Sequence, residues 1–273
     1  MSKKTTKLFV SGDSFTAPGL LSKSYPDWAA TTNWPKEFAK LIPGEVDLYN
    51  PAYRGHNNEY IIKTFFEYIG KYGNPDMVVI MWSCSGRMMM ANELNKNDKQ
   101  SRPNHQRAFV FDPIGMQQVL QFPNPKKPTI KTLTNQALNN FTTWYYNQYY
   151  PAGYYTYAID NFYTNVFIIQ EYCKAHDIPY LFSQAVDVAM IVNSRQRDRA
   201  AAGEYFISHY LEPKIDDEKF MGWPLYSEIG GFVWADITKR TKYAVGDLDS
   251  HPNDLGYKMI ADKLWKRWNE LYK

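Results

Sequence analysis

Four short apolar runs, each bounded by polar or turn-forming residues, constrain the fold of this chain more than any other feature of its sequence. They are Lys7–Ser11, Val46–Tyr49, Met77–Trp82 and Pro179–Ser183. Runs of this length are too short for helices, and most of them lack the alternation of a half-exposed strand. Near-continuous apolar runs are typical of parallel strands buried on both faces. The sequence therefore predicts a parallel sheet that other elements cover on both sides.

Helical patterns lie between and after these runs. Pro35 suits the first turn of a helix that continues through Phe38 and Ile42. Asn57 or Asn58 is a candidate cap for a second helix, and Asn253 or Asp254 for a third near the end of the chain. Because strands and helices alternate, we expect one α/β domain over residues 1–273, a three-layer α/β/α sandwich.

The alternation fails in two stretches. Residues 88–157 are rich in Asn, Gln, Lys and Pro and are interpreted as an insertion, while residues 204–242 are expected to be a second irregular excursion. The first stretch ends in a strongly aromatic segment, residues 141–155. Such a segment either packs the insertion onto the domain or presents tyrosine and tryptophan rings to a sugar.

Composition excludes several classes of function. The net charge of +3 is small and scattered, which argues against a nucleic-acid partner. No stretch has the length of a membrane span, and the apolar run after the basic start is too short for a signal peptide. We expect a soluble protein, either cytoplasmic or carried on a larger particle such as a virion. No phosphate-binding glycine loop or Cys/His cluster occurs, so neither a cofactor nor a metal is expected.

Gly12-Asp13-Ser14, directly after the first apolar run, raises the question of a serine nucleophile. Such a serine requires a general base within hydrogen-bond reach. Of the five histidines, His251 has the most suitable context, in a turn-rich loop before the last helix with Asp247 and Asp249 just upstream. Both loops would lie at the carboxyl edge of a parallel sheet, where α/β proteins assemble their sites.

Gly12-Asp13-Ser14-Phe15 and Asp249-Ser250-His251-Pro252-Asn253 resemble the first and last blocks of the SGNH (GDSL-type) hydrolases. This resemblance implies a flavodoxin-like fold with a mainly parallel five-stranded sheet and ester hydrolysis by a serine, a histidine and an aspartate without metal. By position, Ser14 would be the nucleophile and His251 the base. The family's usual acid stands three residues before the histidine, where this chain has Leu248. Asp249 is therefore favoured as the acid, with Asp247 as the fallback.

The family's oxyanion hole uses the nucleophile's N–H, a glycine N–H from the second block and an asparagine side chain from the third. Ser14 and Gly55 suit the first two parts. After Trp82, however, the chain reads Ser83-Cys84-Ser85-Gly86-Arg87, without an asparagine. Three repairs are open: Asn58 or Asn57 supplies the amide, the Ser85 hydroxyl donates, or Arg87 stabilises the charge. Asn58 is preferred as the donor, with Arg87 and Ser85 facing the substrate.

The resemblance and the residues together predict a serine esterase that acts on a small-molecule or glycan ester. The aromatic-rich insertion favours a small acyl group, such as acetyl, on a carbohydrate. The alternative is a binding or structural module that keeps the hydrolase scaffold with little or no activity, which the missing third-block asparagine would explain.

Overall fold

The computed structural model describes residues 5–17, 32–53, 55–85, 88–91, 108–111, 156–188, 196–247 and 249–273. Its centre is a five-stranded sheet in the order β2-β1-β3-β6-β7, in which every neighbouring pair is parallel. The strands are β1 (Thr6–Ser11), β2 (Val46–Tyr49), β3 (Met77–Trp82), β6 (Tyr180–Gln184) and β7 (Phe220–Met221). This is the flavodoxin-like strand order. The predicted fold class is confirmed.

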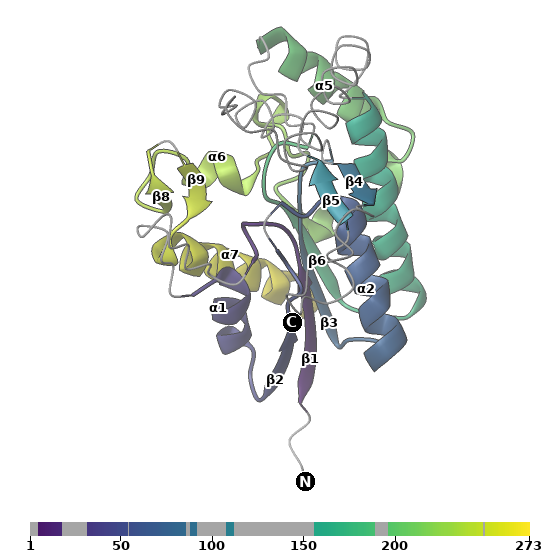
Figure 1. Ribbon diagram of the computed structural model, residues 1–273, viewed down its shortest axis with the longest axis vertical. Helices are drawn as coiled ribbons and strands as arrows, with labels where there is room; N and C mark the ends of the chain where they lie inside the picture. The colour runs from purple at the N-terminus through teal and green to yellow at the C-terminus, as the bar shows by residue number, and fades with distance from the viewer. Residues whose placement is uncertain are drawn as a thin grey trace, which may run out of the picture.

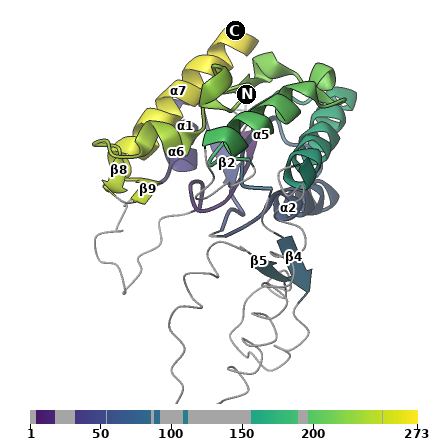
Figure 2. The same ribbon diagram turned by 90° about the horizontal axis from the view of Figure 1, so that it is seen from above.

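Helices cover both faces of the sheet (Figures 1 and 2). One face carries α1 (Trp34–Leu41) and α7 (Asp254–Tyr272), whereas α2 (Asn58–Tyr72) and a helix over residues 156–175 cover the other. Strand β3 shows why both layers are needed. Val78 and Ile80 belong to one apolar core and Val79 and Met81 to the other, and all four are fully buried. Burial on both faces explains why this strand is apolar at every position.

Asparagine side chains fix where the three predicted helices begin. Asn33, Asn57 and Asn253 each accept a hydrogen bond from a backbone N–H in the first turn of α1, α2 and α7. Pro35 lies in the first turn of α1, where its missing N–H costs nothing. Each cap stands just before its helix, so the sequence signals and the structure agree on these starts.

The stretch 204–242 contains more regular structure than the expected irregular excursion. It includes the end of α5 (Gln196–Ser208), three 3-10 turns over Glu212–Lys214, Asp217–Lys219 and Ser227–Ile229, strand β7, and α6 (Trp234–Thr238). Strand β7 is the fifth strand of the sheet, although only two residues long. Its shortness explains why no apolar run revealed it.

Two hairpins complete the described elements: β4 (Met88–Ala91) with β5 (Ala108–Phe111), and β8 (Ala244–Gly246) with β9 (Asp249–Pro252). The first hairpin begins the expected insertion, most of which, including residues 141–155, lies outside the described residues. No helix in the described part of the chain is long and apolar enough to cross a membrane.

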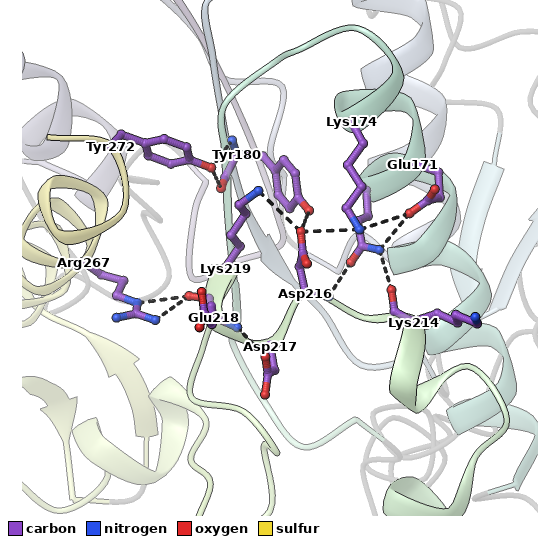
Figure 3. A network of polar contacts seen from close by, with 11 residues as sticks. Glu171, Lys174, Tyr180, Lys214, Asp216, Asp217, Glu218, Lys219, Arg267 and Tyr272 are labelled. Carbon is purple, nitrogen blue, oxygen red and sulfur yellow. Dashed lines mark hydrogen bonds and ion pairs between the residues drawn. The ribbon is translucent and has the colours of Figure 1, made fainter.

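A polar network ties the chain leading into β7 to the amino end of β6 (Figure 3). Asp216 accepts a 2.5 Å hydrogen bond from the Tyr180 hydroxyl and lies 3.5 Å from Lys174 Nζ and 3.4 Å from Lys219 Nζ. Burial disfavours the charged carboxylate, but the hydroxyl and the two ammonium groups outweigh it and lower the pKa of Asp216. The Tyr272 hydroxyl, from α7, donates to the carbonyl of Tyr180 at 2.8 Å. The network thus joins both helical layers to the amino ends of the strands, whereas Ser14 follows the carboxyl end of β1.

Candidate active site

Ser14 lies in a tight turn directly after β1, and the side chain of Asp13 holds this turn together. Asp13 is fully buried and accepts hydrogen bonds from the Phe15 N–H at 3.0 Å and from the Ser83 hydroxyl at 2.8 Å. Its carbonyl accepts from the N–H groups of Thr16 and Ala17. The aspartate therefore braces the loop and ties it to the chain after β3, while the Ser14 side chain is left at the surface of the site.

The Ser14 hydroxyl and the His251 imidazole, 237 residues apart in sequence, lie within hydrogen-bond distance. Ser14 Oγ is 2.8 Å from His251 Nε2, and His251 Nδ1 is 2.6 Å from Asp249 Oδ1. The same Asp249 oxygen accepts from the backbone N–H of His251 at 2.9 Å. An Nδ1–H donated to the carboxylate leaves Nε2 as an acceptor for the serine proton. The arrangement can therefore activate Ser14 as a nucleophile.

Neighbouring groups fix the position of the imidazole. The Phe15 ring packs against it, with ring centroids 4.9 Å apart. Thr238 Oγ1, at the end of α6, donates to the carbonyl of Ser250 at 2.5 Å, and Asn253 Nδ2 donates to Ala244 O at 2.8 Å. These bonds hold β9 between α6 and β8, so the loop that carries the base is supported on both sides.

The other predicted acid does not take part in this arrangement. Asp247 is exposed, and it is Asp249 that contacts the imidazole. Leu248 and Arg87 lie outside the described residues, so the prediction for Arg87 stays a prediction.

Residues around the second and third blocks form a buried hydrogen-bonded unit. Asn58, the first residue of α2, donates through Nδ2 to Ser83 O at 3.1 Å and to Ser85 Oγ at 2.7 Å. Its Oδ1 accepts from the Ser83 N–H at 2.8 Å. Both amide hydrogens of Asn58 are therefore used inside the protein. Direct donation to a substrate would require one of these bonds to break.

Gly55 stands in the turn before α2 with φ of +75°, a conformation that strongly favours glycine. Among the residues that the structure describes, no heavy atom would lie within 4 Å of a Cβ at this position, so these residues leave the backbone approachable from that side. Conformation and access are both compatible with the predicted role of its N–H as a donor.

Sequence reasoning missed three supporting residues, Ser83, Thr238 and the ring of Phe15. The only sequence signal for Ser83 is its place one residue after a buried strand, and Thr238 stands in the excursion that seemed irregular.

A second histidine–carboxylate pair lies between α5 and the helix over residues 156–175. His209 Nε2 is 3.1 Å from Asp160 Oδ1, and its Nδ1 accepts from the Leu211 N–H. The ring stacks on Tyr163, and burial lowers the pKa of His209. This histidine is a packed structural residue. Among the described residues, no group of three or more His, Cys, Asp or Glu side chains is placed to bind a metal ion.

No protein-family model and no curated protein matches the sequence. Solved structures of similar shape include a lipase from a goat rumen metagenome, at 13% identity over 96% of this chain and 97% of that one, with a TM-score of 0.45. A variant of an acetyl xylan esterase from Geobacillus stearothermophilus matches at 13% identity over 96% and 94%, with a TM-score of 0.42. A lipase/acylhydrolase from Enterococcus faecalis matches at 15% identity over 98% of each chain, with a TM-score of 0.40.

Proposed function

We propose that this protein is a serine esterase in which Ser14, His251 and Asp249 act as nucleophile, general base and orienting acid. The observation that supports this proposal best is the continuous set of contacts from Asp249 Oδ1 through the imidazole to Ser14 Oγ, at 2.6 and 2.8 Å. A packing role needs no such alignment. The structural His209 instead has its ring nitrogens bonded to a carboxylate and to a backbone N–H, with no hydroxyl for the imidazole to deprotonate.

In the first half-reaction, Ser14 Oγ attacks the carbonyl carbon of the ester while His251 Nε2 takes the hydroxyl proton. Asp249 stabilises the imidazolium that forms. Collapse of the tetrahedral intermediate breaks the bond to the alcohol, which leaves with the proton from Nε2. A water molecule then attacks the acyl-enzyme, with His251 again as the base, and the carboxylic acid is released. The N–H groups of Ser14 and Gly55 are proposed to donate to the negative oxygen of both intermediates.

For the substrate, we propose a small acyl group, such as acetyl, carried on a carbohydrate. The support is compositional: 22 tyrosines and 8 tryptophans supply rings on which sugars stack.

The test is hydrolysis of p-nitrophenyl acetate and of an acetylated glycan by the wild type, by Ser14→Ala and by a matched control, Ser250→Ala. Ser250 lies beside His251, but its described contact to Thr238 is through the backbone carbonyl. We expect Ser14→Ala to abolish measurable turnover and the control to retain most of it. A fluorophosphonate probe should label the wild type on Ser14 alone.

Absence of hydrolysis and of labelling in the wild type would favour the alternative of a binding or structural module. Turnover by Ser14→Ala at the wild-type rate would show that the serine mechanism is wrong.

A further inference from the structure

After β3, Ser85 falls nearest the place at which the SGNH hydrolases, which this chain resembles, carry the asparagine of their oxyanion hole. We propose that the Ser85 hydroxyl is the third oxyanion donor in this protein and that Asn58 is the positioning residue that aims it. This inference rests on the proposed function, because it names a further catalytic residue for the same reaction.

The contact between Asn58 and Ser85 uses the hydroxyl oxygen as an acceptor and leaves its proton for a different partner. A serine hydroxyl has one proton and two lone pairs. Asn58 Nδ2 donates to Ser85 Oγ at 2.7 Å, so the oxygen is the acceptor in this bond and its own proton must point elsewhere. Within the described part of the chain, no hydrogen bond from that hydroxyl to an acceptor is found. Ser85 is only 4% exposed, so a substrate oxygen that reaches this hydroxyl would meet little competition from bulk water for its proton. A developing oxyanion would supply the acceptor.

Asn58 is itself held rigidly. It bonds the backbone of Ser83 from both sides, accepting from the N–H at 2.8 Å and donating to the carbonyl at 3.1 Å. If the Asn58 amide were rotated by 180°, its NH₂ group would face the Ser83 N–H, which needs an acceptor, and its oxygen would face the Ser83 carbonyl. The amide is therefore fixed in the orientation described. A donor held in place before the reaction costs no reorganisation when charge develops.

The backbone of residues 83–85 is anchored from the β6 side as well. The Ser85 N–H donates to Val188 O at 2.9 Å, and Gln184 Nε2 donates to Ser83 O at 3.0 Å. The segment is therefore fixed between the first turn of α2 and the chain that follows β6. This double anchoring gives the hydroxyl a defined place.

That place is beside the nucleophile loop. Strand β3 is the direct neighbour of β1 in the sheet, and both strands run in the same direction, so Ser14 and Ser85 leave the sheet at the same edge. The Ser83 hydroxyl bonds the carboxylate of Asp13, the residue before Ser14, at 2.8 Å. The two loops are thus connected side chain to side chain.

Chemically, Ser85 donates a hydrogen bond and keeps its proton throughout. The bond from Asn58 polarises the hydroxyl and makes it a better donor, because linked hydrogen bonds strengthen one another. The two residues together would replace the amide donor that this chain lacks.

The central variant is Ser85→Ala, with Ser227→Ala, an exposed serine of a 3-10 turn, as the control. We expect Ser85→Ala to lower kcat for p-nitrophenyl acetate by about 10²-fold with little change in KM, as for other oxyanion donors. Ser85→Asn should recover at least tenfold of this loss, because it restores the amide. The affinity for a phenylboronic acid, which forms a tetrahedral adduct on Ser14, should fall in parallel with kcat/KM.

A double-mutant comparison tests the positioning role. Asn58→Ala should lower kcat by a similar factor, and the double variant should be no worse than about threefold below Ser85→Ala, since Asn58 acts through Ser85. If Asn58→Ala does not fold, Ser85→Cys gives a second test: it keeps the shape but donates poorly, so it should resemble Ser85→Ala.

The outcomes separate this inference from the function itself. Inactive wild type, or active Ser14→Ala, refutes the esterase proposal. A Ser14-dependent wild type whose Ser85→Ala variant stays within threefold in kcat refutes the donor role alone. Loss of activity with raised KM and unchanged boronate affinity also refutes it, because that pattern indicates a structural role.

Discussion

Replacing Asp249 by asparagine should lower kcat by about three orders of magnitude while leaving the imidazole in its working orientation. The carboxylate oxygen that faces Nδ1 also accepts from the backbone N–H of His251. Because an amide would turn its oxygen toward these two donors, Asp249→Asn preserves the tautomer in which Nε2 accepts the serine proton. What it removes is the negative charge beside the imidazolium of the transition state.

The geometry sets the size of this loss. The charge centres of the carboxylate and the imidazolium lie roughly 4 Å apart when the facing atoms are in hydrogen-bond contact, and at an effective dielectric constant of 20 their attraction is about 4 kcal/mol. The side chains of His251 and Asp249 are 28% and 26% exposed, so a near-surface dielectric constant is appropriate. With about 1.4 kcal/mol for each factor of ten, the expected loss is about 10³-fold. Asp249→Ala, which also removes the orientation, should lose about 10⁴-fold.

The assay is steady-state hydrolysis of p-nitrophenyl acetate by the wild type, Asp249→Asn, Asp249→Ala and Asp247→Asn. The last variant is the matched control, because the exposed Asp247 carries the same change only two residues away. It should stay within twofold of the wild type. A large loss in Asp247→Asn together with normal kcat in Asp249→Asn would refute the assignment of the acid.

Further predictions concern stability. A Cβ on Gly12 would lie 2.2 Å from Thr16 Oγ1 and 2.8 Å from a backbone carbonyl, so Gly12→Ala should cost about 1–3 kcal/mol or more in urea unfolding. Gly70→Ala lies in the last turn of α2, where a Cβ would meet no heavy atom of the described residues within 4 Å, and should instead stabilise by up to about 0.5–1 kcal/mol; equal effects of the two changes would contradict the packing. Asp216 has a pKa lowered by folding, so its contribution is present above the unfolded value near 4 and is lost as the pH falls through the folded one. Asp216→Asn should therefore lower the free energy of unfolding by about 1 kcal/mol at pH 7 and less at pH 3; a difference that grows toward acid pH would refute this.

Local signals made the sheet and the helix starts predictable from the sequence. The apolar run of β3 indicates burial on both faces of the sheet. Asn57 and Asn253 are recognisable as helix caps because the N–H that each one accepts lies only three residues further along the chain. Strand β7 was not predictable, because two residues carry no period and its place depends on pairing with β6.

Part of the candidate site was predictable from the sequence in the same way, and part of it depends on tertiary contacts. The expected Ser14 and His251 do lie in contact, since both stand in loops that parallel-sheet topology brings to one edge. The Asn58–Ser85 bond was not foreseen as a unit. It joins residues 27 positions apart through side-chain geometry that no spacing rule encodes.

The position of β9 so late in the chain has a consequence for synthesis. Asp249 and His251 are only two positions apart and can form their contact locally. Ser14 precedes His251 by 237 positions, so its contact with the imidazole forms only after the later part of the chain has been synthesised. The hairpin is then held by the cap of α7, which packs against α1. During translation, the nucleophile loop leaves the ribosome more than 200 residues before its base, so a growing chain carries an inert serine. Hydrolysis of a chromogenic ester by stalled ribosomal complexes of increasing length should therefore begin only when α7 has emerged, which makes activity a direct signal that the Ser14 and His251 loops have met.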